Sequence, residues 1–326
     1  GDKSLSKRNM IEVIKPLRQM GAKINSKNNK LPIIIKGFNE TIPITYNQKI
    51  PSAQIKSAIL FASLNSPGLI TVIENIPTRN HSEVLLKKFG AKIQIKKYKK
   101  GKIIKIIGQK ELKAKNILIA GDPSAAAIIG SAALIIPNSE IKIKKVNINK
   151  TRATFFKILK KMNANIKIFN QKKISNEQIA DITFKSSNLK GVHLGKKTVA
   201  KMIDEIPIFS ILATFAKGNS SFKGGGELKN KESNRIKSLY NGLIACKIKV
   251  KRERDGLKIT GNKENNTAGY AKIKTYYDHR IAMAFLIMDL ASKKKIIVDN
   301  LNCIKTSFPN FVSLIKNLGG NFSKKN

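Results

Sequence analysis

The sequence of 326 residues has few cysteine, histidine, aromatic and acidic residues. Its two cysteines, Cys246 and Cys303, cannot form a disulfide framework or a thiolate metal cluster. Three scattered histidines argue against a histidine-based metal site. Aromatic residues make up 6%, which is few for the stacking platforms of nucleic-acid binders. The longest apolar run, over residues 124–136, is too short to cross a bilayer.

Acidic residues are far fewer than basic ones: the sequence has 20 Asp and Glu and 63 Lys and Arg, so the formal net charge is +43. The lysines are spread along the chain among Ile and Asn, which is typical of a coding bias that leaves lysine on solvated surfaces. The charge is also compatible with a basic cleft for small polyanions. A lysine-rich nucleic-acid-binding protein is a remote alternative, because no recognition motif accompanies the charge. With 41% hydrophobic residues, the chain can bury a core. Its length of 326 residues predicts about two domains.

An internal repeat organises the chain. Five times, a helix with apolar periodicity ends at a small residue and a strand pattern follows. The small residues are Gly21, Gly90, Asn163, Ala245 and Gly319. Between them lie apolar helices, expected to be buried, at about 53–65, 123–136, 204–216 and 279–291. Their expected N-caps are Ser52, Asp122, Asp204 and Asp278.

Only eight residues are arginine, and five of them recur at helix starts. Four lie 13, 11, 11 and 10 residues before the small residue of their repeat, namely Arg8, Arg79, Arg152 and Arg235. Arg280 follows Asp278 by two residues. A helix N-terminus already favours an anion, so a cation there is best explained by a bound anion or by a neighbouring carboxylate. Both explanations stay open from the sequence.

Several segments, in this order, carry a family resemblance. They are Ser52-Ala-Gln54, Thr78-Arg-Asn-His81, Gly121-Asp-Pro-Ser124, Met202-Ile-Asp204-Glu-Ile-Pro207, Lys229-Asn-Lys-Glu-Ser-Asn-Arg235, Asp278-His-Arg280 and Thr306-Ser-Phe-Pro309. Together they resemble the 5-enolpyruvylshikimate-3-phosphate (EPSP) synthases over nearly the whole chain. The resemblance implies an α/β fold of two lobes, each built from three βαβαββ units. Five of six units are expected here, with lobes at 1–120 and 121–326, and a chain that lacks about the first 100 residues of the family.

The resemblance also implies the reaction. The enolpyruvyl group of phosphoenolpyruvate is transferred to the 5-hydroxyl of shikimate 3-phosphate, and phosphate is released without metal or cofactor. It assigns phosphoenolpyruvate to Arg8, Gln54, Arg235 and Arg280, shikimate 3-phosphate to Ser52, Ala53, Gln54, Arg79, Asp204 and Lys231, and catalysis to Asp204 and Glu232; Thr78 and Lys305 match less closely. We expect a cytoplasmic monomer that binds these two small molecules, with no nucleic acid or membrane, and slow turnover by the chain as given.

Alternatives accompany these assignments. Asp204 could act only as a helix cap, and Glu232 only as an ion-pair partner of Lys231 or Arg235. The enolpyruvyl transferases of cell-wall synthesis, which use a UDP-sugar, share the fold and are the alternative family. Two departures from the family pattern bear on the site. Asn9 replaces a proline and is expected to loosen a helix start, and Asn234 replaces an aspartate and is expected to leave Arg235 less firmly oriented.

Overall fold

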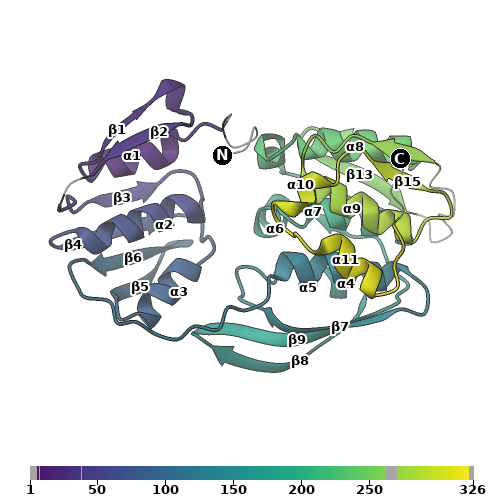
Figure 1. Ribbon diagram of the computed structural model, residues 1–326, viewed down its shortest axis with the longest axis horizontal. Coiled ribbons are helices and arrows are strands. Elements are labelled where there is room, and N and C mark those ends of the chain that lie inside the picture. The colour runs from purple at the N-terminus through teal and green to yellow at the C-terminus, as the bar shows by residue number, and fades with distance from the viewer. Residues whose placement is uncertain (1–5, 7, 38, 262–269, 323–326) are drawn as a thin grey trace. The chain divides into compact units, whose positions relative to one another are not determined.

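The computed structural model describes residues 6, 8–37, 39–261 and 270–322. It divides into two compact units (Figure 1). The first unit contains Gly1–Ile119 and Lys173–Glu177, and the second contains Ala120–Lys172 and Gln178–Asn326. We describe each unit by itself.

The first unit is an α/β arrangement around a four-stranded sheet of order β3-β4-β6-β5. Strands β3 and β4 are parallel, and the other pairs are antiparallel. A separate antiparallel pair, β1-β2, follows α1. The elements are α1 (Ile11–Gln19), β1 (Lys23–Ser26), η2 (Lys27–Asn29), β2 (Ile33–Lys36), β3 (Thr45–Gln48), α2 (Ala53–Ala62), η3 (Ser63–Asn65), β4 (Leu69–Glu74), α3 (His81–Lys88), β5 (Lys92–Tyr98) and β6 (Gly101–Ile107).

The second unit repeats the same architecture. Its sheets have the orders β7-β9-β8 and β10-β11-β13-β12, with a parallel pair β14-β15. The elements up to β11 are α4 (Pro123–Ile135), β7 (Glu140–Asn147), α5 (Thr154–Lys161), β8 (Asn165–Ile174), β9 (Glu177–Lys185), β10 (His193–Leu194), α6 (Lys196–Lys201), α7 (Ile206–Thr214) and β11 (Gly218–Phe222). The remaining elements are η4 (Gly226–Asn230), α8 (Arg235–Ala245), β12 (Val250–Glu253), β13 (Gly256–Gly261), β14 (Ala271–Ile273), α9 (His279–Leu290), β15 (Ile296–Val298), α10 (Asn302–Lys305) and α11 (Phe311–Asn317).

The expected βαβαββ repeat is present. The orders β3-β4-β6-β5 and β10-β11-β13-β12 are the same, and β7-β9-β8 matches them when the Gly121–Val146 parallel bridge stands for the first strand. Three whole repeats therefore lie within the described residues. The five helix-to-strand motifs are accounted for by these three and by parts of two more, α1-β1-β2 and β14-α9-β15-α11.

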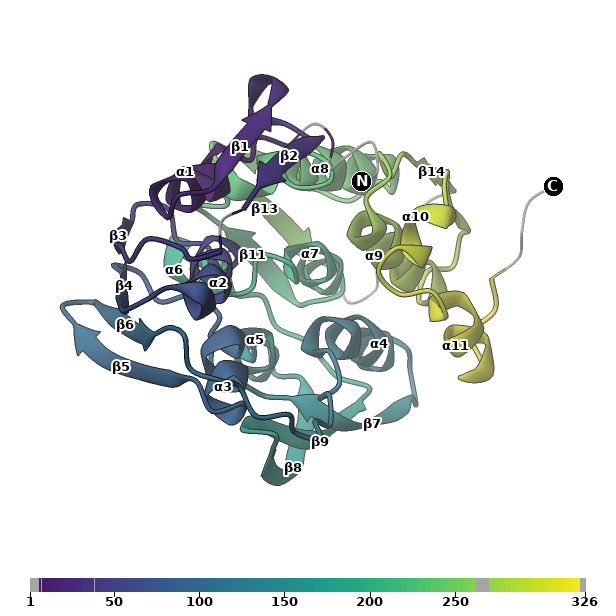
Figure 2. The same ribbon diagram turned by 60° about the vertical axis from the view of Figure 1, so that its left-hand side comes forward.

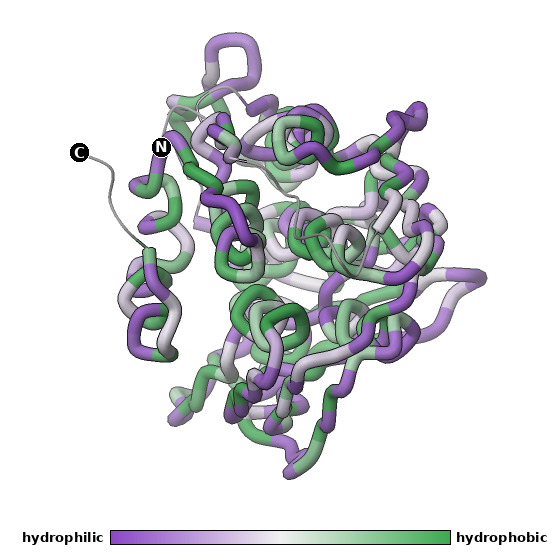
Figure 3. Tube along the Cα trace, turned by 90° about the vertical axis from the view of Figure 1, so that its right-hand side faces the viewer, coloured by the Kyte–Doolittle hydropathy of each residue, from purple (hydrophilic) through white to green (hydrophobic). Residues whose placement is uncertain are grey.

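The apolar helices of the second unit form its core. Helices α4, α7 and α9 pack against one another (Figure 2). All nine residues of α7 are buried. The hydrophobic stretches follow the helices, and the projecting loops are hydrophilic (Figure 3). Helix α2 of the first unit differs from this expectation, because it buries one face and leaves Phe61 55% exposed. None of the helices in the described ranges is both long and apolar enough for a membrane span.

Two expected helix limits are wrong by two residues. Helix α7 begins at Ile206 with Glu205 at the N-cap, so Asp204 does not cap it. Pro207 sits in the first turn, where its fixed φ is favourable. In the fourth repeat the left-handed residue that ends the helix is Lys247, with φ 59°, in place of Ala245. The amide of Ile248 closes the turn by donating to the carbonyl of Leu243 at 2.9 Å.

The caps at Ser52, Asp122 and Asp278 are confirmed. Each side chain accepts a hydrogen bond from an amide in the first turn of its helix, at 3.4, 2.9 and 3.0 Å. Gly21, Gly90, Asn163 and Gly319 all have positive φ, as a residue that ends a helix in the left-handed conformation requires. The sequence pattern therefore located most helix ends correctly.

Candidate functional site

In the second unit, the polar site is built around Arg235, the first residue of α8. Its guanidinium is 1% exposed and donates from Nε to Asp278 at 2.8 Å and from Nη2 to Glu232 at 2.6 Å. Nη1 donates to Asp204 at 3.3 Å. A planar fork with five N–H donors can serve several carboxylates at once. Arg235 is thus held firmly, contrary to the expectation drawn from Asn234.

Asn234 has a different role from the one expected. It is the N-cap of α8, and its Oδ1 accepts from the amide of Lys237 at 3.1 Å. Asn9 likewise uses its side chain at a helix start, where Oδ1 accepts from the amide of Ile11 at 2.9 Å. Both asparagines therefore satisfy amides that a helix start leaves without a backbone acceptor.

Asp278 ties α9 to α8. Its Oδ1 caps α9 by accepting from the amide of Arg280, and its Oδ2 accepts from Ser233 at 3.0 Å and from Arg235. Burial alone would raise the pKa of Asp278, but the charge and hydrogen bonds of Arg235 outweigh it, and the pKa lies below its ordinary value. Burial and the charge of Arg280 lower the pKa of His279, which keeps that imidazole neutral near pH 7.

Four cations surround the carboxylate of Asp204, which lies in the turn between α6 and α7. Arg235 is at 3.3 Å, Lys231 at 3.8 Å, and Arg280 and Arg152 are both at 4.0 Å. Arg280 also donates to the backbone carbonyl of Asp204 at 3.1 Å. The Asp204 side chain is 15% exposed, so it remains accessible. The structure thus brings together Asp204, Lys231, Glu232, Arg235 and Arg280; Lys305 is exposed on α10 and joins none of these described contacts.

Arg152 also belongs to this group of residues, although the family resemblance assigned it no role. Its Nη2 donates to Ser124 at 2.8 Å and to Asp122 at 3.2 Å. Ser124 in turn donates to the buried carboxylate of Glu205, next to Asp204. The signal for Arg152 was its position in the arginine register, two residues before α5. This chain of hydrogen bonds links the cap of α4 to the turn that carries Asp204.

The first unit carries a second set of predicted residues. Ser52 caps α2, so Ala53 and Gln54 occupy its first turn, and Gln48 donates to the carbonyl of Ser52 at 2.6 Å. Thr78 and Arg79 precede α3. A buried lysine, Lys56, joins the two segments by donating to the carbonyl of Arg79 at 2.9 Å. Arg8 lies three residues before α1. The repeat in the sequence predicted the positions of these residues at or near helix starts. It did not predict the buried Lys56.

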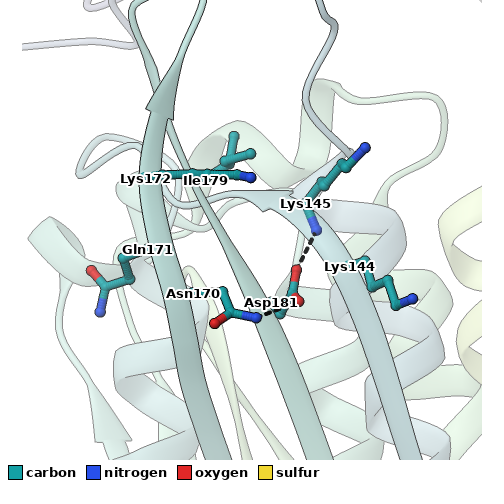
Figure 4. Close-up of a pocket in the computed structure, with 7 residues that line it drawn as sticks. All are labelled: Lys144, Lys145, Asn170, Gln171, Lys172, Ile179 and Asp181. Carbon is teal, nitrogen blue, oxygen red and sulfur yellow. Dashed lines mark hydrogen bonds between the residues drawn. The ribbon is translucent and has the colours of Figure 1, made fainter.

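A cavity of about 330 Å³ lies elsewhere in the second unit, on the sheet β7-β9-β8 (Figure 4). Lys144, Lys145, Asn170, Gln171, Lys172, Ile179 and Asp181 line it. Asp181 accepts from the amide of Lys145 at 2.9 Å and from Asn170 at 3.1 Å, and these hydrogen bonds lower its pKa. The carboxylate thereby supports the irregular backbone between Ile143 and Val146. None of the predicted site residues lines this cavity.

Comparisons with known proteins agree with the resemblance. The family model for EPSP synthase (3-phosphoshikimate 1-carboxyvinyltransferase) matches residues 1–315. The chain belongs to the EPSP synthase family. It is 42% identical to the 3-phosphoshikimate 1-carboxyvinyltransferase of Parvibaculum lavamentivorans over 99% of this chain and 72% of the relative, and 41% identical to that of Zymomonas mobilis with shares of 99% and 72%.

Solved structures give the same result for the fold. EPSP synthase from Acinetobacter baumannii is similar with a TM-score of 0.85 and 35% identity, covering 98% of this chain and 72% of that one. The enolpyruvyl transferase NikO from Streptomyces tendae is similar with a TM-score of 0.74 at 14% identity, covering 97% and 72%. The expected enolpyruvyl transferase fold is therefore confirmed, and this chain is a member of a transferase family.

Proposed function

We propose that this chain transfers the enolpyruvyl group of phosphoenolpyruvate to the 5-hydroxyl of shikimate 3-phosphate, with release of phosphate. Family membership supports the reaction, and the observation that carries it to particular residues is the Asp204 carboxylate amid four cations within 4.0 Å. Both substrates are polyanions, and guanidinium and ammonium groups are the side chains that bind such anions. The curated relatives bear the name of the shikimate enzyme, which disfavours the UDP-sugar alternative.

In this proposal Asp204 is the general base for the attacking hydroxyl. A base has to be ionised, and neighbouring positive charge favours the ionised form of a carboxyl. Asp204 is also accessible, with 15% of its side chain exposed, and Glu205 occupies the N-cap position of α7. Glu232, 26% exposed and 2.6 Å from Arg235, would move protons at the methylene carbon of the other substrate.

Phosphoenolpyruvate is assigned to Arg8, Gln54, Arg235 and Arg280. Asp278 fixes the Nε side of Arg235 at 2.8 Å, so the guanidinium plane is set before an anion arrives. Nη2 also donates to Asp278 at 3.4 Å, while Nη1 contacts Asp204 and Nη2 contacts Glu232, and both of these carboxylates are partly exposed. A substrate carboxylate would therefore compete with Glu232 for the outer donors of Arg235 without disturbing the buried pair.

Shikimate 3-phosphate is assigned to Ser52, Ala53, Gln54, Arg79, Asp204 and Lys231. Ser52 accepts from Ile55 through its hydroxyl oxygen, so its proton can be donated to a phosphate at the start of α2. Helix N-termini favour bound phosphate. The proposed reaction requires no metal or cofactor, and the proposed ligands are the two small substrates. We further propose that the protein is a monomer in the cytoplasm that does not bind nucleic acid.

The test measures substrate binding and phosphate release separately. Shikimate 3-phosphate should bind by calorimetry and support phosphate release from phosphoenolpyruvate, whereas UDP-N-acetylglucosamine should do neither. Asp204→Asn should retain binding and lose phosphate release by about 100-fold or more.

The matched control is Asp181→Asn, which changes an aspartate of the same unit outside the site and should leave both readouts unchanged. Preference for the UDP-sugar, or the same phosphate release by Asp204→Asn as by the unchanged chain, would contradict the proposal.

A further inference from the structure

A buried ion cluster in the first unit lies beneath the Thr78–Arg79 segment. Lys56 on α2 is 0% exposed, and its ammonium contacts Glu74 at 3.0 Å and Glu83 at 2.7 Å. Its third donor goes to the carbonyl of Arg79 at 2.9 Å. An ammonium has three N–H donors, so these partners use all of them. A lysine buried this completely is rare, and its desolvation is offset only by well-placed partners.

A second set of hydrogen bonds joins the same cluster to the Thr78–Arg79 segment. Oε1 of Glu74, at the end of β4, accepts from the amide of Thr78 at 3.2 Å and also from the Thr78 hydroxyl. It is the atom that contacts Lys56. Both sides of the Thr78–Arg79 peptide link are therefore fixed to one buried pair, Lys56 and Glu74.

Glu83 provides a natural comparison with Glu74. Both carboxylates are buried, at 2% and 1% exposure, and both contact the Lys56 ammonium. Among the contacts of the described residues, Glu83 bonds Lys56 alone, whereas Glu74 also bonds Thr78. Two carboxylates share one ammonium, so removing either leaves a balanced buried pair. Both single variants should therefore fold, with Glu74→Met the less stable because it also leaves the Thr78 donors without their acceptor.

We propose that Lys56 and Glu74 are positioning residues that fix the backbone of Thr78 and Arg79 and thereby aim the Arg79 guanidinium at the phosphate of shikimate 3-phosphate. The inference rests on the proposed function for the identity of the ligand. Groups that hold a binding side chain in place typically change affinity by about 10- to 100-fold when removed. The cluster itself does not touch substrate.

The test compares Glu74→Met with Glu83→Met, which have similar shape and lose one carboxylate each. Glu74→Met should weaken shikimate 3-phosphate binding about tenfold by calorimetry and raise its KM, with the KM for phosphoenolpyruvate nearly unchanged. Glu83→Met should stay within about twofold of the unchanged chain on both. Thr78→Val should resemble Glu74→Met, and Thr78→Ser, which keeps the hydroxyl, should recover binding.

Amide exchange gives a readout that does not depend on the ligand. The Thr78 amide should exchange faster in Glu74→Met and at the unchanged rate in Glu83→Met, under conditions where both variants are folded. Equal effects of the two variants on exchange and on affinity would overturn the positioning role. If the unchanged chain does not bind shikimate 3-phosphate, the proposed function fails, and exchange still decides whether Glu74 orders the segment.

Discussion

The two units each bury an ion cluster beside a predicted binding residue, and the clusters are built differently. In the second unit the central cation, Arg235, is itself a predicted substrate ligand and is 1% exposed. In the first unit the central cation, Lys56, is fully buried and reaches the predicted ligand Arg79 through a backbone carbonyl. In the proposed assignment, one cluster contains a substrate ligand, and the other holds the backbone of a substrate ligand.

The chemistry of the two cations explains this difference. A guanidinium presents donors along a plane, so Arg235 can bind buried Asp278 on one side and partly exposed Glu232 on the other. An ammonium is a compact charge with three donors, and all three donors of Lys56 bind partners inside the protein. Changes at Arg235 should therefore affect stability and ligand binding together, whereas changes around Lys56 should separate the two.

The largest effect is expected from Arg235→Met. The substitution leaves Asp278, which is 0% exposed, as an uncompensated buried charge, and breaking such a pair costs about 3–5 kcal/mol of unfolding free energy. Urea unfolding followed by thiol labelling measures it. Cys246 and Cys303 are both buried in the second unit, and burial raises their pKa values to about 12 and about 11, so they should react only on unfolding.

The control for that measurement is Arg252→Met in the same unit. Arg252 is exposed and lies over the ring of Tyr240 at 4.4 Å, a contact worth about 0.5–1 kcal/mol. Phosphoenolpyruvate binding should be lost in Arg235→Met and kept in Arg252→Met. If Arg235→Met unfolds at the same urea concentration as the control, the buried pair does not stabilise the second unit.

Much of the fold could be predicted from the sequence, because short local patterns, namely capping residues and apolar runs, mark the helices of each repeat. Caps at Asp122 and Asp278 and apolar runs behind them located α4 and α9 within a residue or two. The misses have local causes too. Lys247 adopts a left-handed conformation that is unusual for lysine, so the smaller Ala245 was the stronger signal. Before α7 only Asp204 was expected as a cap, and Glu205 occupies the N-cap position without a side-chain cap hydrogen bond.

The site was harder to predict than the fold. The arginine register could be seen because arginine is rare, yet it could not show that Arg152 lies 4.0 Å from Asp204, which depends on packing between distant segments. The role of Lys56 could not be predicted because lysine is abundant in this sequence. One lysine among many is not distinguished from the others until its burial is known. Ligand identity came from the family resemblance, since positive charge alone fits any small polyanion.

A smaller effect than Arg235→Met is expected from protonating Asp278, because Arg235 then keeps Glu232 and Asp204 as partners. The folded-state pKa of Asp278 lies below its ordinary value. Its contribution to stability is thus complete above the unfolded pKa of about 3.9 and is lost as pH falls through the lower, folded value. The unfolding free energy, measured by urea titration followed by circular dichroism between pH 5 and 3, should decline in this window.

Two variants separate this cause from general acid denaturation. Asp278→Asn should be less stable at pH 5 and should show a shallower decline below pH 4. Asp255→Asn removes a carboxylate whose pKa is also lowered, by its hydrogen bond to Lys229, but which is solvent-exposed, so it should flatten the decline less than Asp278→Asn does. A decline that is the same in Asp278→Asn would assign the acid sensitivity to other groups.

The smallest effect concerns the cap of the helix that begins at Arg235. Asn234→Ala removes the hydrogen bond that Oδ1 accepts from the amide of Lys237, and such a cap is worth about 1 kcal/mol. Asn310→Ala is the matched control, because Asn310 is also an N-cap but makes no side-chain cap hydrogen bond; it should change the unfolding free energy by less than about 0.5 kcal/mol. Asn234→Asp should gain about 0.3–1 kcal/mol from the helix dipole and leave phosphoenolpyruvate binding unchanged, because three carboxylates already fix Arg235. Tighter phosphoenolpyruvate binding by Asn234→Asp would show that the asparagine does leave Arg235 poorly oriented, and that the second cluster is less rigid than its hydrogen bonds indicate.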